Sequence, residues 1–307
     1  MASSAAANVI FCKNSIFGEY CKEWSIGIYM GDSPLNIAPM EGMANPVLTA
    51  RDVNDVYAEA VADPFMIRQH GKWYMFFEVI HHDSKHGDIG LATSYDGLKW
   101  KYEQIVLVEP FHLSYPCVFE WKKELYMIPE TSWENSVRLY KSHNFPYDWT
   151  FEKTLISLPD VADATPFYYD DKWWMFTSVA SHDVLRLFFC EDLTGEWQEH
   201  PCSPIIEGNC QIARPGGRVL ILDGRIIRFA QNDYPTYGTA LRAFEIFELS
   251  TTTYKEKESS ESPLLSGTGS GWSRSGMHHA DLHYIGPDQW IGCVDGFSRR
   301  LVAGFRF

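Results

Sequence analysis

The sequence of 307 residues is short of positive charge and lacks any long apolar run. It holds 26 Lys and Arg against 40 Asp and Glu, which gives a formal net charge of −14. Because nucleic acids and anionic lipid surfaces are bound through basic side chains, we expect neither as a partner. No segment approaches the roughly 18 consecutive apolar residues that a membrane helix needs, so we expect no membrane insertion.

The N-terminal segment and the cysteines carry no targeting or redox signal. The start, MASSAAANVIFCKNS, has no basic region before its apolar stretch, which Lys13 interrupts, so it does not resemble a secretory signal. The seven cysteines are an odd number, are widely scattered and include no C-x-x-C pair. This usage is typical of reduced, mostly buried thiols. We therefore expect a soluble protein in the cytoplasm.

Aromatic side chains, by contrast, are abundant. The sequence has 19 Phe, 16 Tyr and 11 Trp, together 15 % of its residues. Aromatic residues favour β-strands, and their rings also stack on sugars. The hydrophobic share of 45 % and the charged share of 21 % are those of an ordinary globular protein, which excludes a disordered chain. A folded, β-rich protein is the expectation.

A repeat of about 50 residues organises the chain. Each copy has a proline, an apolar strand, a turn and a second, aromatic-rich strand. The prolines recur at intervals of 52, 50 and 49 residues: Pro64, Pro116, Pro166 and Pro215. A tryptophan that closes the third strand recurs at intervals of 49 and 48 residues: Trp100, Trp149 and Trp197. Two markers with the same period identify true structural repeats.

Repeats of this length, each with three or four short strands, are typical of β-propeller blades. A fifth copy without the proline begins at His279, so the sequence predicts an all-β, five-bladed propeller over residues of about 60 to 300. The segment Trp24–Met30 resembles a third strand, and we expect it to close the last blade and cover a sheet edge. The polar stretch 251–272 is typical of a loop rather than a linker. We expect residues 1–307 to form a single domain.

Two sets of residues are expected beside the central channel, on one face of the propeller. They combine carboxylates, imidazoles and a guanidinium from separate blades, as a pocket for a small ligand requires. The first set, at the starts of the inner strands, is Asp63, Tyr115, Thr165 with Asp163 nearby, Arg214, and Asp281 with His278 and His279. The second set, at the ends of the second strands, is Glu78, Glu130, Ser178, Gln231 and Asp295.

Asp63 is the leading candidate for chemistry. An Asp before a proline at the first inner strand is placed as the base or nucleophile of a propeller glycosidase, or it caps backbone N–H groups. Glycoside hydrolysis also needs a carboxyl group that protonates the leaving oxygen. Glu130 and Glu207 are the candidates for this acid. For each of them, an equally good interpretation is a rim residue that binds a ligand hydroxyl.

The histidines and glycines do not predict a metal or nucleotide site. Neither the group His81, His82, Asp83 and His86 nor the group around His278 has a specific metal-ligand spacing. We therefore predict no metal and no cofactor. The pair Gly216-Gly217 is too short for a phosphate loop and is typical of a bulge or a close backbone approach.

Several motifs resemble known families. The segment ADPF at Ala62–Phe65 and the pattern S-x-D-G-x-x-W ending at Trp100 resemble the arabinanase, xylosidase, invertase and levansucrase clan of glycosidases. The runs YMIPETSWENSVRLYKSHNFPYDW, TGEWQEHPCSPI, ARPGG, RFAQND and YGTALRAFEI resemble the N-terminal domain of plant glucosamine inositolphosphorylceramide transferase and its bacterial relatives. Together these patches cover most of residues 45–300.

The two resemblances imply different functions. The hydrolase clan uses a base Asp in the first blade, a second Asp in the third and an acid Glu in the fourth. Only Asp63 carries over, because the third position aligns with Thr165 and Ala213 precedes Arg214 in the fourth blade. These departures argue against hydrolysis. In the transferase, the similar domain precedes a separate glycosyltransferase domain.

Three hypotheses follow from the sequence. The first, which we favour, is a carbohydrate-active or carbohydrate-binding propeller that recognises a glycan or sugar-containing small molecule in the central pocket. The second is a glycoside hydrolase that uses Asp63 with Glu130 or Glu207. The third is an interaction module for a glycosyltransferase partner. In the first, the substrate-binding set is Glu78, Tyr115, Asp163, Thr165, Arg214, Gln231, His279 and Asp281.

Overall fold

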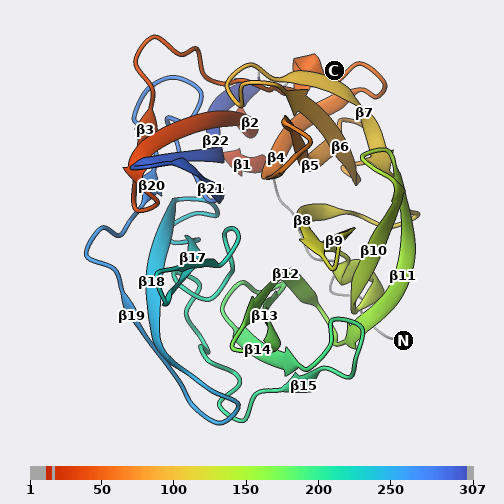
Figure 1. The fold of residues 1–307 in the computed structure, drawn as a ribbon. Helices are drawn as coiled ribbons and strands as arrows, with labels where there is room; N and C mark the ends of the chain where they lie inside the picture. Colours follow the sequence, from red (N-terminus) through yellow and green to blue (C-terminus); the bar gives the residue numbers. More distant parts are fainter. Residues whose placement is uncertain (1–11, 16–17, 303–307) are drawn as a thin grey trace, which may run out of the picture.

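Five antiparallel sheets surround a central axis in the computed structural model, which describes residues 12–15 and 18–302 (Figure 1). The first blade contains β4 (Ala58–Gln69), β5 (Lys72–His81), β6 (Gly87–Ser94) and β7 (Lys101–Leu107). The second contains β8 (Ser114–Trp121), β9 (Glu124–Glu130), β10 (Ser136–Asn144) and β11 (Asp148–Ser157). The third contains β12 (Val161–Tyr169), β13 (Lys172–Val179), β14 (Leu185–Cys190) and β15 (Gln198–Glu199). The predicted five-bladed propeller is confirmed.

The fourth blade departs from regular geometry at its inner strand. Its strands are β16 (Leu220–Leu222), β17 (Arg225–Asn232), β18 (Ala240–Leu249) and β19 (Tyr254–Glu258), and β20 (Leu265–Ser266) also pairs with β18. Before β16, only an isolated bridge between Pro215 and Ala230 continues the ladder. A Cβ on Gly217 would lie 1.9 Å from the carbonyl oxygen of Ala280, which confirms the expected close backbone approach.

The stretch 251–272 is not simply a loop, and that expectation is wrong in part. It contains β19 and β20, which both pair with β18. The segment Tyr254–Glu258, with the sequence YKEKE, is the outer edge of its blade, and an edge strand tolerates alternating charge because solvent hydrates its side chains. High polarity concealed a strand in this case.

The last blade is closed by the N-terminal part of the chain, as predicted. It is built from β21 (Ala280–Gly286), β22 (Gln289–Val302), β2 (Gly18–Ser33), β3 (Asn36–Pro39) and β1 (Cys12–Ser15). In β2, Trp24 pairs with Phe297 and Met30 pairs with Ile291, so the predicted strand lies against β22 (Figure 1). This pairing joins the two ends of the propeller and closes the ring.

The core lies between neighbouring blades. Five of the buried clusters each join side chains of two adjacent blades; for example, Phe76 of the first blade packs edge-on against Trp149 of the second, with ring centroids 5.3 Å apart. This arrangement accounts for much of the aromatic content, because flat rings fill the gaps between twisted sheets. The described residues contain only two short 3₁₀ turns, η1 (Ala50–Asp52) and η2 (Ser132–Glu134), and none of their helices is long and apolar enough to span a membrane.

Candidate functional site

Three residues occupy the same bulge in the first three blades: Asp63, Tyr115 and Asp163. Each follows an inner-strand residue that pairs with the end of the second strand. Those pairs are Ala62 with Glu78, Ser114 with Glu130, and Ala162 with Ser178. Their φ angles of 51°, 46° and 48° lie in the left-handed region, which Asp tolerates better than most residues. The bulge turns the backbone at the same point in each blade.

This register corrects the sequence alignment. Aligning the repeats on their prolines placed Thr165 at the position of Asp63 and left Asp163 two residues away. The structure places Asp163 there instead, because Thr165 lies beyond the bulge and pairs with Phe176, as Phe65 pairs with Phe76. The proline of the third repeat is displaced, and the carboxylate is not. The first and third blades therefore present equivalent Asp residues.

Arg214 and His279 complete the ring in the fourth and fifth blades. The carbonyl of Arg214 accepts a hydrogen bond from the backbone N–H of Gln231, at 2.8 Å. His279 faces Asp295 in the same way, at 3.4 Å. Five blades thus contribute one inner residue each to the channel, and the chemistry differs between the two sides of the ring.

We call the first side the Arg214 side and define it as Arg214, Asp163, Glu130 and Gln231. The guanidinium contacts Asp163 through Nε and Nη2, and Nη2 also lies 3.3 Å from Oε2 of Glu130. The side-chain amide of Gln231 donates to Oδ2 of Asp163, at 3.0 Å. Three blades are joined through one cation, and both carboxylates have strong donors.

Burial and charge set the protonation of the Arg214 side. Burial raises the pKa of Asp163 to about 7; Arg214 opposes this shift and Glu130 adds to it. Burial also acts on Glu130, but Arg214, Asp163 and His112 together hold the pKa of Glu130 below its usual value. Although burial opposes its charge, the pKa of Arg214 is raised, chiefly by Asp163. Arg214 and Glu130 are therefore charged at neutral pH.

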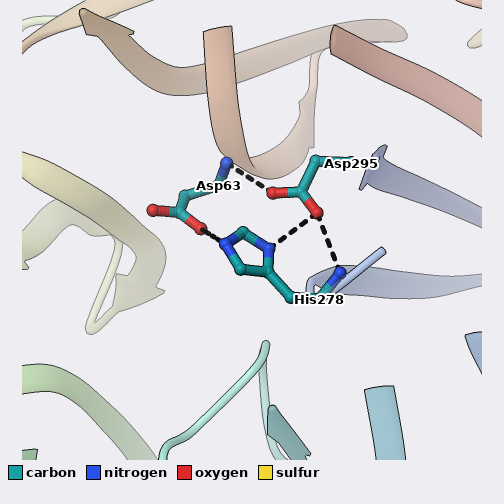
Figure 2. Close-up of side chains that lie close together, drawn as sticks. All are labelled: Asp63, His278 and Asp295. Carbon is teal, nitrogen blue, oxygen red and sulfur yellow. Dashed lines mark hydrogen bonds and ion pairs between the residues drawn. The ribbon is translucent and has the colours of Figure 1, made fainter. Parts of the chain in front are cut away.

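We call the second side the Asp63 side and define it as Asp63, His278, His279 and Asp295. The backbone N–H of Asp63 donates to Oδ2 of Asp295, at 3.0 Å. Oδ1 of Asp63 lies 3.9 Å from Nε2 of His278 and 4.0 Å from Nδ1 of His279, both longer than a hydrogen bond. Figure 2 shows the Asp63 carboxyl group facing the His278 ring, with the Asp295 carboxylate beside both and bonded to the Asp63 backbone N–H and the His278 ring.

The hydrogen bonds fix the form of each histidine on the Asp63 side. Nδ1 of His278 lies 2.8 Å from Asp295, and its Nε2 lies 2.8 Å from the hydroxyl of Tyr237. Nε2 of His279 lies 3.0 Å from the carbonyl oxygen of Pro64, which only accepts, so this nitrogen carries the proton. Burial lowers the pKa of His279 to about 4, so its Nδ1 is a free acceptor at neutral pH.

Asp63 itself is held in its neutral form. Burial, and then the neighbouring carboxylates of Asp295, Glu78 and Asp163, raise its pKa well above the usual value. Within the described residues, Oδ1 of Asp63, Nδ1 of His279 and Oε1 of Gln231 are buried without a hydrogen-bond partner. Six further buried polar atoms of the described residues share this state, and such atoms are costly unless water, an ion or a ligand binds them.

The remaining predicted residues have other environments. Tyr115 is fully buried, and its hydroxyl accepts from Gly217 N–H at 2.8 Å and lies 2.9 Å from Oγ1 of Thr165. Asp281 accepts hydrogen bonds from the side chain of Arg218 and from the backbone N–H of Met66, so it joins the fifth blade to the fourth and the first.

The glutamates of the prediction divide into two kinds. Glu78 is buried and lies 3.2 Å from Nε2 of His112. Glu207 is exposed in the loop between β15 and β16, and the described residues show no contact between it and the ring. Of the two acids named from the sequence, only Glu130 lies in the ring.

Three residues of the site escaped sequence reasoning: His182, Asp233 and Tyr237. Nη1 of Arg214 lies 2.6 Å from Nε2 of His182, whose Nδ1 lies 2.7 Å from Asp233. They sit in turns after β13 and β17, outside the repeat markers. Two signals were available: the RFAQND run, which ends at Asp233, and the YGTALRAFEI run, which begins at Tyr237.

One group of side chains has the composition of a metal site. Ligand atoms of Asp63, His278 and Asp295 lie within 4.8 Å of one another. Both ring nitrogens of His278 are already engaged, one by Asp295 and one by Tyr237. A metal would therefore have to displace Tyr237, and the sequence prediction of no metal stays a prediction.

Comparison with known proteins decides the family. The family described as "Glucosamine inositolphosphorylceramide transferase 1, N-terminal" matches residues 19–297. The chain belongs to this family. It is 34 % identical over 296 residues to glucosamine inositolphosphorylceramide transferase 1 of Oryza sativa subsp. japonica, and 33 % identical over 307 residues to that of Arabidopsis thaliana. These alignments cover 89 % and 92 % of the chain but 40 % of each relative, so the chain spans about two-fifths of their length.

Solved structures share the fold at much lower identity. The catalytic domain of Coprinopsis cinerea GH62 α-L-arabinofuranosidase has a TM-score of 0.61 at 12 % identity, covering 89 % of this chain and 96 % of that one. A putative glycoside hydrolase of Bacteroides ovatus has a TM-score of 0.64 at 14 % identity, covering 86 % and 98 %. The resemblance to propeller glycosidases therefore holds for the fold. As a member of the transferase family, this chain therefore shares a carbohydrate-related architecture with the glycosidases.

Proposed function

We propose that this propeller binds a sugar at the Asp63 side of its ring and recognises it without hydrolysing it. The observation that supports this most is the pair of unpartnered buried atoms, Oδ1 of Asp63 and Nδ1 of His279, which lie 4.0 Å apart. A single ligand hydroxyl fits their chemistry. It would accept a hydrogen bond from the neutral Asp63 carboxyl group and donate one to His279.

The Arg214 side supports binding rather than hydrolysis. Glycoside hydrolysis needs a carboxylic acid and a carboxylate that are both free to act on the substrate. The carboxylates of Asp163 and Glu130 are both engaged by Arg214, at the fourth-blade position where the hydrolase clan is expected to have its acid. We infer that these groups hold the ring together and shape its edge.

The relatives suggest the setting of this binding. They are glucosamine inositolphosphorylceramide transferases, and the chain spans about two-fifths of their length. We propose that the propeller presents or orients a glycan for a glycosyltransferase, within one chain or between two. A glycosyltransferase is thus the proposed protein partner, and the cytoplasmic location stays a prediction.

Hydrolysis remains a second candidate because of one observation. Asp163 takes the position equivalent to Asp63, and its pKa of about 7 suits a proton donor at neutral pH. In this version Asp163 would protonate a leaving oxygen while a second carboxylate acted as base. Removal of the carboxyl group of Asp163 would then abolish turnover.

One experiment separates the two candidates. The wild-type protein is applied to a glycan array and, in parallel, incubated with a panel of aryl glycosides. Binding without turnover, weakened by Asp63→Ala and not by Asp170→Ala in the turn between β12 and β13, supports recognition. Turnover that Asp163→Asn abolishes supports hydrolysis, and a wild type that neither binds nor cleaves any sugar contradicts both.

A further inference from the structure

Trp133 is an exposed indole close in sequence to the ring. It lies in η2, directly after the second-blade residue Glu130, and 57 % of its surface is exposed. Among the described residues it is the one Trp with a largely exposed side chain. Trp133 packs against the rings of two histidines, whereas the exposed Phe247 contacts no other aromatic ring of the described residues.

The support under Trp133 is a buried histidine. The rings of Trp133 and His112 stack with centroids 5.9 Å apart and an interplanar angle of 30°, and His86 approaches at 6.5 Å with its ring nearly perpendicular. Nδ1 of His112 accepts from the backbone N–H of Gly87 at 2.9 Å, so its Nε2–H faces Oε1 of Glu78 at 3.2 Å. His112 therefore has a fixed orientation, and so does the indole stacked on it.

The same support is continuous with the ring. The hydroxyl of Ser132, next to Trp133, donates to Oε1 of Glu130 at 2.8 Å, and the other oxygen of Glu130 faces Arg214. Glu78 is among the charges that raise the pKa of Asp63. Glu78 contacts His112 beneath the indole, and Glu130 contacts Ser132 beside it. Both glutamates belong to the set of second-strand ends that borders the central ring.

We propose that Trp133 is a stacking platform for a second sugar ring of the glycan bound at the Asp63 side. The ligand is then at least a disaccharide, with one ring at the Asp63 side and the next ring lying on the indole face. An aromatic face packs against the C–H groups of a pyranose, while neighbouring carboxylates accept its hydroxyl protons. The inference rests on the proposed function, because the platform extends that site.

The test compares monosaccharides with their disaccharides. Glucose, mannose, N-acetylglucosamine, cellobiose, mannobiose and chitobiose are titrated into the wild type and into Trp133→Ala, Trp133→Phe and Asp63→Ala by calorimetry. Tyr284→Ala is the matched control, because Tyr284 is similarly exposed, at 59 %, on β21. Thermal unfolding checks that each variant is folded.

The outcomes separate the platform from the site beneath it. We expect one disaccharide to bind at least about tenfold more tightly than its monosaccharide, a gain of about 1.4 kcal/mol. Trp133→Ala removes this gain and leaves monosaccharide binding unchanged, Trp133→Phe keeps part of it, and Tyr284→Ala has no effect. If the wild type and Trp133→Ala gain the same affinity from the second sugar, or if neither gains any, the platform proposal is wrong and the proposed function stands. If Asp63→Ala binds both sugars normally, or the wild type binds none, the proposed function fails and the platform with it.

Discussion

The two sides of the central ring have similar residues but differ in whether their polar atoms have hydrogen-bond partners. On the Arg214 side, one guanidinium and one amide supply donors to both carboxylates. On the Asp63 side, a neutral carboxyl group and a neutral imidazole face each other at 4.0 Å without a bond between them. The difference teaches that equivalent positions of a repeat serve either to join blades or to bind a ligand, and the hydrogen-bond partners tell which.

The largest expected effect comes from breaking the Arg214 side. Arg214→Met leaves two buried carboxyl groups without their cation, and loss of one partner of a buried pair costs about 3–5 kcal/mol. The free energy of unfolding, measured with urea, is the test. Arg225→Met is the control, because Arg225 pairs with Glu245 at the surface, where a pair contributes at most about 1 kcal/mol. If both variants lost the same free energy of unfolding, a structural role for the Arg214 side would be contradicted.

The next largest effect concerns Tyr115, which takes the ring position of the second blade. Tyr115→Phe removes the acceptor of the buried Gly217 N–H, and an unpaired buried donor costs about 1–3 kcal/mol. We expect this loss in urea unfolding, with no change in sugar binding. Tyr284→Phe, at an exposed position, should leave stability unchanged. Weakened sugar binding in folded Tyr115→Phe would move this residue to the ligand-binding group.

A smaller change in stability is expected on the Asp63 side. Asp63→Asn keeps the shape of the side chain and removes no hydrogen bond of its carboxyl group, since Oδ1 has no partner and Oδ2 takes part in none that the structure shows. The free energy of unfolding should change by less than about 1 kcal/mol. Sugar affinity is expected to fall by about tenfold in Asp63→Ala, which removes the hydrogen-bonding group, because one or two hydrogen bonds are lost. A loss of several kcal/mol in unfolding would mean that Asp63 is structural, and the comparison between the two sides would fail.

The smallest expected change is in the dependence of stability on pH. The folded-state pKa of Asp163 is raised to about 7, so the folded protein keeps a proton that the unfolded chain loses above about pH 4. This group therefore makes stability fall as pH rises from about 4 to 7. The pKa of its neighbour Glu130 is lowered, so Glu130 affects stability only below about pH 4.5, where it makes stability rise with pH. Between pH 5 and 7.5, Asp163→Asn should flatten the slope, and an unchanged slope would contradict this assignment.

Much of the fold was readable from the sequence, because its period is carried by residues that the blades need. Prolines beside the bulges and tryptophans between blades recur at a nearly fixed spacing, and the resemblance of Trp24–Met30 to a third strand of the repeat identified the closing strand. The strand Tyr254–Glu258 was missed because an outer edge needs no apolar face.

The site was only partly readable, and the reason is local geometry. The ring residues Asp63, Tyr115 and Arg214 were found from their position before a proline. Asp163 was named but placed two residues off, because a bulge changes register without leaving a mark in the sequence. His182 and Tyr237 lie in turns that no period reaches, and only tertiary packing brings them to Arg214.

The most direct test of the central claim is a crystal structure of the protein with a sugar that it binds on the array. The account predicts a hydroxyl of the sugar within hydrogen-bond distance of both the Asp63 carboxyl group and Nδ1 of His279, with Arg214 still bound to Asp163. A sugar bound elsewhere, or one that takes Arg214 away from Asp163 and leaves Asp63 untouched, would contradict it.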